Sequence, residues 1–211
     1  MYVGRIVSVA RTRDGRNAAL YRVSSRSFPN RRVVDQGGRL AVIPREGHEG
    51  DVERSPYIAY HCLRVAGGWA IATNGSQTDP IAEKVADGMP IREALAHALL
   101  TLDYERDDYS TPRIAAAVPA RGDEGWLAIV RRDALIVRSV ALEAGRARWL
   151  ATYEGDDVRD SQASEFDADT AEEAARFAIR GGAFASLEKP VTAAAALAGA
   201  GEFRLAAHTP G

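Results

Sequence analysis

The segment YRVSSRSFPNR, residues 21–31, gathers charged and hydroxyl side chains that together suit an anionic ligand. Arginine offers a planar, permanently charged fork of donors, while serine hydroxyls and loop N–H groups add neutral ones. Arginines in such a run also pair with surface carboxylates such as Asp35, face solvent, or form nucleic-acid-binding patches, and spacing alone leaves these alternatives open. The candidate anion-binding residues are Arg22, Ser24, Ser25, Arg26, Asn30 and Arg31.

A second group of polar and aromatic residues is suited to acid–base chemistry on a ring. Glu105, in LDYERDDY, is a candidate general base, and Asn74, in NGSQTD, is a candidate donor to a developing oxyanion. Gly75, which has no side chain, would allow the substrate to approach the backbone closely. Tyr60 and Tyr104 can stack on a ring or donate a phenolic proton. The alternatives are a solvated carboxylate in a charge run, a turn asparagine and core tyrosines.

Three short motifs supply the remaining candidate ligand-binding residues. Tyr57 lies in SPYIAY, Tyr153 and Glu154 lie in TYEG, and Lys189 begins KPVTAA. Each motif falls where a strand or helix is expected to begin or end, and binding sites are usually placed on such loops.

Composition and missing motifs restrict the function further. Lys plus Arg number 27 against 29 Asp plus Glu, so the net charge of −2 would not attract nucleic acid or a membrane, and neither partner is expected. The single cysteine, Cys62, fits a reducing, cytoplasmic compartment, and no stretch is long enough to span a bilayer. The histidines show no metal-ligand spacing, and no dinucleotide-binding, phosphate-loop or C-x-x-C motif occurs. We therefore expect neither a metal nor a cofactor.

The elements that must position these residues can be read from the hydrophobic periodicity. Short apolar runs separated by turns predict strands in VGRIVSVA, AALYRVSS and RLAVIP, followed by two strands joined at Gly67–Gly68. Helical spacing in residues 78–102 predicts two helices, the first capped by Thr78 or Asp79 and ended by Gly88, and the second opened by Pro90.

Strand-like runs return after these helices, in RIAAAVPA, GWLAIVRR, ALIVRSVAL and RARWLATYEG. TAEEAARFAIRGG predicts a third helix with a capping box from Thr170 to Glu173, and KPVTAAAALAG and FRLAAH predict two closing strands. About ten strands in two blocks, with three substantial helices, predict one α+β domain over residues 1–211 rather than a βαβ sheet.

Several of these motifs occur together in the order typical of one family. MYVGR, YRVSSRSFPNR, PYIAY, NGSQTD, LDYERDDY with TPRIAA, TYEG and KPVTAA resemble the archaeal-type IMP cyclohydrolases, from Met1 to about Leu197. The resemblance implies a four-layer αββα sandwich of the N-terminal nucleophile hydrolase type. It also implies a hydrolase acting on C–N bonds in cyclic amidines, which closes 5-formamidoimidazole-4-carboxamide ribonucleotide (FAICAR) to IMP in purine biosynthesis. The implied partner is therefore a small purine nucleotide.

The implied reaction joins two groups of one substrate, so it needs no external nucleophile. Bulky Tyr2 should hinder removal of Met1, and no Ser, Thr or Cys stands at the chain start to attack, so covalent catalysis is not expected. The resemblance implies that Arg26 and Arg31 bind the phosphate of the nucleotide, and Lys189 is a further candidate for this role. Under the same resemblance, the candidate catalytic residues for ring closure are Glu105, Tyr104, Tyr60 and Asn74.

Two other functions remain as alternatives. One is an amidohydrolase of the same fold acting on a small amide, and the other is a non-catalytic purine nucleotide-binding module. Exposed sheet edges and a small site within one domain also lead us to expect a homo-oligomer.

Overall fold

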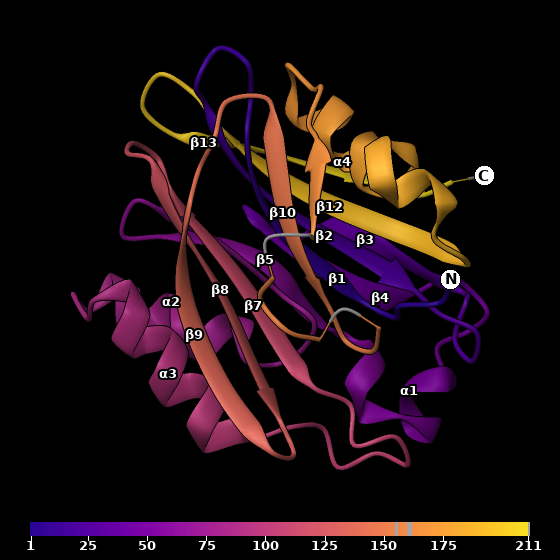
Figure 1. The fold of residues 1–211 in the computed structure, drawn as a ribbon. Coiled ribbons are helices and arrows are strands. Elements are labelled where there is room, and N and C mark those ends of the chain that lie inside the picture. The colour runs from indigo at the N-terminus through magenta and orange to yellow at the C-terminus, as the bar shows by residue number, and fades with distance from the viewer. Residues whose placement is uncertain (155, 160–161, 211) are drawn as a thin grey trace.

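Two antiparallel β-sheets lie face to face in the computed structural model of the protein (Figure 1). The structure describes residues 1–154, 156–159 and 162–210, so Gly155, which ends the TYEG motif, lies outside the described residues. One sheet contains, in spatial order, β11 (Ala163–Glu165), β10 (Arg146–Ala151), β1 (Ile6–Arg11), β2 (Asn17–Ser24), β12 (Pro190–Ala198) and β13 (Phe203–His208). The other contains β3 (Arg31–Asp35), β4 (Arg39–Pro44), β5 (Tyr60–Ala66), β6 (Trp69–Thr73), β7 (Arg113–Pro119), β8 (Glu124–Arg131) and β9 (Ala134–Ala141).

Helices cover the outer face of each sheet (Figure 1). α2 (Thr78–Ala86) and α3 (Ile91–Leu102) pack on the seven-stranded sheet. α4 (Ala171–Arg180) and the short 3-10 helix η2 (Gly182–Ser186) pack on the six-stranded sheet. A further short helix, α1 (Asp51–Arg54), and the 3-10 turn η1 (Pro56–Ile58) connect β4 to β5.

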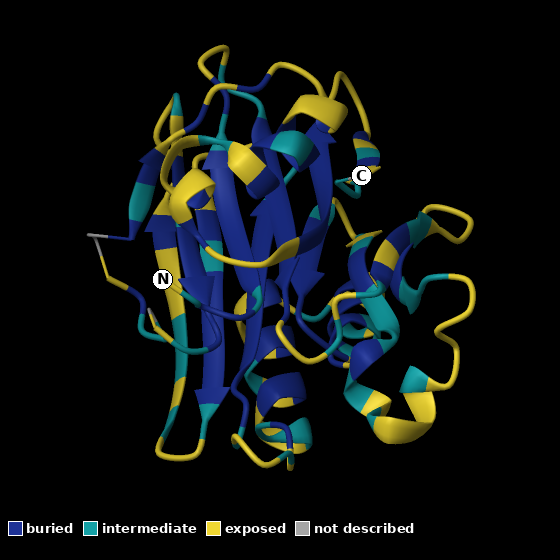
Figure 2. Ribbon diagram, turned by 90° about the vertical axis from the view of Figure 1, so that its right-hand side faces the viewer, coloured by how far each residue is buried: buried dark blue, intermediate teal, exposed yellow. Residues whose placement is uncertain are grey.

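Strand periodicity explains how each sheet is buried on both faces. Along β2, Tyr21 and Val23 point into the core between the sheets, while Ala18 and Leu20 point toward α4. Figure 2 shows the central strands buried along almost their whole length. A β-strand alternates its side chains between faces, so Arg22 must share the α4 side with Leu20.

Most of the predicted elements are confirmed. The α+β class and the three longer helices are correct, and the capping box between Thr170 and Glu173 is present at α4. The predicted cap of α2 is wrong, because the N-cap is Gln77 and makes no capping hydrogen bond. The structure has two short edge strands that the sequence did not predict. β3 begins with the charged pair Arg31–Arg32, which resembles a loop, and β11 has only three residues. No helix among the described residues is long and apolar enough to cross a membrane.

Candidate active site

The candidate residues meet because antiparallel strands bring alternate chain connections to the same end of the two sheets. At this end lie the start of β1, the loop from β2 to β3, and η1 before β5. The loop from α3 to β7 and the end of β10 lie there as well. Segments more than a hundred residues apart in the chain therefore contribute to one site.

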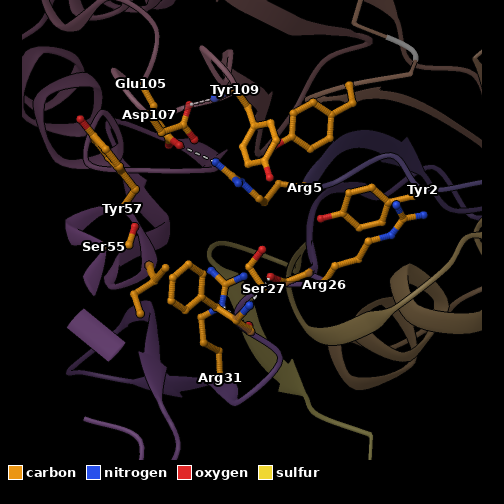
Figure 3. A pocket seen from close by; sticks show the side chains of 14 residues that line it. Tyr2, Arg5, Arg26, Ser27, Arg31, Ser55, Tyr57, Glu105, Asp107 and Tyr109 are labelled. Carbon is orange, nitrogen blue, oxygen red and sulfur yellow. Dashed lines mark hydrogen bonds and ion pairs between the residues drawn. The ribbon is translucent and has the colours of Figure 1, made fainter. Parts of the chain in front are cut away.

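A cavity of about 330 Å³ opens at this end of the molecule (Figure 3). Its volume falls in the range typical of small-molecule sites. Its lining combines cations, carboxylates, hydroxyls and aromatic rings: Tyr2, Arg5, Ser25, Arg26, Ser27, Phe28, Arg31, Ser55, Tyr57, Ile58, Glu105, Asp107, Tyr109 and Tyr153. Six of the residues proposed from the sequence are in this set: Ser25, Arg26, Arg31, Tyr57, Glu105 and Tyr153.

Glu105 is buried in the wall of this cavity and is only 1% exposed. Its backbone N–H donates to Thr111 O at 2.8 Å, which holds the loop after α3 against the sheet. Its carboxylate Oε2 accepts a hydrogen bond from Arg5 Nη2 at 2.6 Å. The alternative of a solvated carboxylate is therefore wrong, although its neighbour Arg106 does pair at the surface with Asp103.

Burial controls the acidity of this ion pair. Desolvation raises the pKa of Glu105, and the opposing effects of Arg5 and Arg113 do not cancel it. Burial lowers the pKa of Arg5, but Glu105 and the nearby tyrosines together raise it by more, so the guanidinium stays charged. The cavity thus contains a carboxylate with greater basicity than an exposed glutamate, held beside a permanent cation.

Arg31 places a second cation in the same cavity without a neutralising carboxylate. It is 3% exposed, and its Nε donates to Phe28 O at 3.0 Å. Among the described residues it makes no ion pair. Desolvation lowers its pKa, which expresses the cost of burying an uncompensated charge. Such a group suits an anionic ligand, which would supply the missing charge.

Arg26 lies at the mouth of the cavity, where it is tied to the chain start (Figure 3). Its guanidinium carbon is 4.3 Å from the centre of the Tyr2 ring, and its Nη2 lies 3.1 Å from Glu188 Oε2. The other oxygen of Glu188 lies 3.1 Å from the α-ammonium of Met1. The N-terminus is therefore engaged in an ion pair beside the site.

Aromatic rings form another wall of the cavity. Tyr2 stacks on Tyr153 with ring centres 5.9 Å apart, and Tyr109 meets Tyr153 edge to face at 6.5 Å. The loop bearing Tyr109 is held by Asp107, which accepts from the backbone N–H of Tyr109 and of Thr111. These rings offer flat apolar surfaces of the kind on which a planar base stacks.

Tyr60, predicted to be catalytic, does not line the cavity but lies close behind it. Its hydroxyl is 2.5 Å from the hydroxyl of fully buried Tyr21. Burial raises the pKa of both phenols, and the charges of Arg31 and Arg5 act to lower that of Tyr60. Both tyrosines are therefore protonated at neutral pH.

Asn74 and Gly75, at the end of β6, also lie behind the wall rather than in it. Asn74 is fully buried, donates to Pro112 O at 2.9 Å, and accepts from the backbone N–H of Ile114 at 2.8 Å. The structure thus places Asn74, predicted to donate to substrate, behind the cavity wall, with its amide bonded to Pro112, Gln77 and Ile114. Gly75 does provide close approach, but to Glu105 and its neighbours instead of to a ligand.

Arg22 and Ser24, predicted to hold the anion, do not line the cavity. Both are buried on the α4 face of β2, and Arg22 Nε donates to Ser24 Oγ at 2.9 Å. The Arg22 guanidinium donates to Ile179 O, Phe184 O and Leu187 O at 3.1, 2.7 and 2.7 Å. Burial lowers its pKa to about 10. This arginine satisfies carbonyls of α4, η2 and the residue after η2, and it does not line the cavity.

Four other predicted residues lie outside the cavity. Asn30 Nδ2 is 3.2 Å from His48 Nδ1, and the Tyr104 ring packs under the guanidinium of Arg106 at 4.8 Å. Glu154 is exposed. Lys189 lines a neighbouring hollow of about 170 Å³ with Ser25 and Arg45, and its backbone adopts a positive φ of 53°.

The cavity is also lined by Arg5, Asp107, Tyr2 and Tyr109, which were not among the candidate residues. Arg5 carried a signal, because a charge that interrupts an apolar strand start is unusual unless it is paired or functional. The two tyrosines carried none, since their position depends on how the chain start meets the loop after α3. Among the described residues, no group of three or more His, Cys, Asp or Glu side chains could hold a metal ion.

Comparison with known proteins places the chain in a family. A family model described as "IMP cyclohydrolase-like protein" matches residues 2–202. A protein named IMP cyclohydrolase from Methanosphaera stadtmanae is 43% identical over 196 residues, which cover 93% of this chain and 94% of that protein. One from Methanococcus maripaludis strain C6 is 43% identical over 208 residues, covering 98% and 99%. One from Natronomonas pharaonis is 54% identical over 155 residues, covering 73% and 74%. The chain belongs to the IMP cyclohydrolase-like family.

Proposed function

We propose that this protein is an enzyme that closes FAICAR to IMP with loss of water, in purine biosynthesis. The observation that carries the proposal is the pairing of two unusual groups in one cavity. Glu105 is a buried carboxylate with raised pKa, and Arg31 is a buried cation without a carboxylate partner among the described residues. A base and an anion anchor are what a nucleotide ring closure requires.

The nucleotide is bound through its phosphate and its base. Arg31 and Arg26 hold the phosphate, assisted by the hydroxyls of Ser25 and Ser27 at the same wall. The imidazole ring lies among the aromatic residues, with Tyr57 and Tyr153 as its nearest candidates. Fixing both ends restrains the formamide in the rotamer that presents its carbon to the carboxamide, and such orientation contributes several kcal/mol, about 7 in favourable cases.

Ring closure with loss of water moves two protons to the formyl oxygen, one from the carboxamide nitrogen and one from the formamide nitrogen. The carboxamide nitrogen attacks the formyl carbon while Glu105 accepts a proton from that nitrogen, and the C–N bond forms as negative charge develops on the formyl oxygen. Arg5, paired with Glu105, supplies a fixed positive charge near the reacting groups. Protonated Glu105 returns the proton to this oxygen and makes it a hydroxyl. The C–O bond then breaks as the proton of the former formamide nitrogen passes to the hydroxyl, which leaves as water, and the C=N bond of the new ring forms. Tyr60, protonated beside Tyr21, is a second candidate donor.

The wider organisation is proposed on the same basis. The two facing sheets, each covered by helices on its outer side, support a four-layer αββα sandwich of the N-terminal nucleophile hydrolase type. We propose one domain over residues 1–211, acting in the cytoplasm as a homo-oligomer. The fold type does not require a terminal nucleophile here, because the proposed reaction joins two groups of one substrate.

An ultraviolet assay of ring closure with purified protein and synthetic FAICAR tests the proposal. We expect IMP to form far faster than in protein-free buffer. Binding of IMP without turnover would instead indicate a nucleotide-binding module. Release of formate or ammonia instead of IMP would indicate an amidohydrolase.

A further inference from the structure

Buried polar side chains behind the cavity wall form a chain of contacts that ends at Glu105. Asn74 and Gln77 are fully buried, and Arg113 is 5% exposed. Gln77 Nε2 donates to Asn74 Oδ1 at 2.8 Å and to Ile114 O at 3.2 Å. Gln77 Oε1 accepts from Arg113 Nη1 at 3.0 Å. Gln77 therefore uses both ends of its amide inside the protein.

The same Arg113 nitrogen stops short of Glu105. Arg113 Nη1 lies 3.8 Å from Glu105 Oε1, which is beyond hydrogen-bond distance. Glu105 Oε1 is buried and has no hydrogen-bond partner among the described residues. The other oxygen, Oε2, is bonded to Arg5 at 2.6 Å. The carboxylate is thus bonded on one side and unbonded on the other, although a guanidinium lies close to each oxygen.

The surroundings fix this arrangement. A Cβ atom on Gly75 would lie 2.7 Å from both Arg113 Nη1 and Gln77 Oε1, and 3.3 Å from Glu105 Oε1, so the backbone is in close contact with all three side chains. The amide of Gln77 has only one workable orientation, because its reversal would place the NH₂ group against the guanidinium. Asn74 is itself held by Ile114 N–H and Pro112 O.

We propose that Gln77 is a positioning residue for ring closure, which holds Arg113 away from Glu105 Oε1 and so preserves the basicity of the carboxylate. This inference rests on the proposed role of Glu105 as the base. Without the Gln77 acceptor, Arg113 would be free to close the remaining gap and donate to Oε1. A hydrogen bond to the ionised form of a carboxylate favours that form and makes it a weaker base.

Charged and titratable groups face Glu105 from several elements. Arg5 comes from the segment before β1, Arg113 from β7, Asp107 from the loop after α3 and Tyr60 from β5. Burial raises the pKa of Glu105, Arg5 and Arg113 lower it, and Asp107 raises it. Gln77 is neutral, so it acts on this balance only by fixing where the Arg113 charge lies.

The test replaces Gln77 with a residue of similar size that is a poor acceptor. In Gln77→Met, carbon-13 NMR titration of glutamate carboxyls reports Glu105 directly, because its signal is the one missing from Glu105→Gln. We expect the pKa of Glu105 to be lower than in the wild type. We also expect kcat to fall roughly tenfold at neutral pH, less than the hundred- to ten-thousand-fold associated with a general base, while IMP affinity is retained.

The matched controls are Arg113→Met and the double variant. If Gln77 acts through Arg113, adding Gln77→Met to Arg113→Met leaves the pKa of Glu105 where the single Arg113 variant placed it. A pKa of Glu105 that is unchanged or higher in Gln77→Met overturns the inference. If Gln77→Met does not fold, Arg113→Met is the deciding variant. The pKa of Glu105 must rise in Arg113→Met, and an unchanged pKa contradicts the proposed effect of Arg113 on Glu105. The titration does not depend on turnover, so a protein with the expected pKa changes but no ring closure would refute the proposed reaction alone.

Discussion

Arg5 and Glu105 stand one hundred residues apart in the chain and meet at 2.6 Å in the wall of the cavity. The first precedes β1 of one sheet and the second precedes β7 of the other, so the ion pair joins the two sheets at the end where the site lies. A buried ion pair is costly to desolvate, and removing one partner leaves an uncompensated charge. Its presence in the cavity wall is better explained by chemistry than by stability.

Arg31→Met should weaken nucleotide binding without unfolding the protein. Loss of a hydrogen-bonded charge typically costs about 1.5–3 kcal/mol, so we expect IMP affinity to fall roughly 10- to 150-fold, while inosine affinity changes little. Calorimetric titration with both ligands measures the effect. Arg32→Met is the control, since Arg32 is the next residue of β3 and is exposed on the other face. Equal losses for IMP and inosine would assign Arg31 to the fold instead of the phosphate.

Arg22→Met should lower the stability of the protein and leave nucleotide binding unchanged. The substitution leaves the carbonyls of Ile179, Phe184 and Leu187 without their donor, and each unsatisfied group costs about 1–3 kcal/mol. We expect the free energy of unfolding to fall by about 3 kcal/mol or more, with IMP affinity of the folded protein unchanged. Urea unfolding measures the change in stability, and calorimetric titration measures the affinity for IMP. If the variant were as stable as the wild type but bound IMP more weakly, Arg22 would instead be a ligand-binding residue.

The pH dependence of stability should carry the signature of Glu105. Because burial raises its pKa, the folded protein binds this proton more tightly than the unfolded chain does. Its contribution to stability is therefore greatest below the unfolded-state pKa, about 4.3, and is lost as pH rises through the folded-state pKa. Urea unfolding from roughly pH 4 to 8 should show wild-type stability falling relative to Glu105→Gln. A relative stability that rises with pH would mean that Arg5 and Arg113 outweigh burial.

Turnover should not require a metal ion. The proposed steps use only the carboxylate, the arginines and the substrate's own groups. We expect kcat after exhaustive chelation to stay close to its starting value. A loss of turnover that one divalent ion restores would contradict this mechanism.

Local patterns predicted the fold better than they predicted the site. The periodicity of β1, β2 and α4 reflects burial that is already visible in neighbouring residues, and the capping box of Thr170 needs only four residues. The site depends on which face of a strand each residue occupies. Arg22 and Arg31 look equivalent in the sequence, but β2 turns one toward α4 and β3 turns the other toward the cavity.

The same limitation explains the errors around Glu105. Its charged neighbours Asp103 and Arg106 are solvated, as such runs usually are, but the positive φ of Asp103 at the end of α3 redirects the chain so that Glu105 turns inward. Asn74 was singled out as a substrate donor, but its observed partners are the nearby Gln77 and, from the start of β7, Pro112 and Ile114, which only the sheet brings beside it. Contacts between distant segments could not be derived from local patterns.

The central claim is that this cavity closes the purine ring with Glu105 as the base, and Glu105→Gln tests it most directly. The substitution keeps the size and hydrogen-bonding capacity of the side chain but removes its basicity. Ring closure of FAICAR, followed by ultraviolet absorbance across pH, should show kcat reduced by roughly a hundred- to ten-thousand-fold, with the acidic limb of the profile lost and IMP affinity retained. A kcat within about threefold of the wild type would contradict the account, because no general base contributes so little.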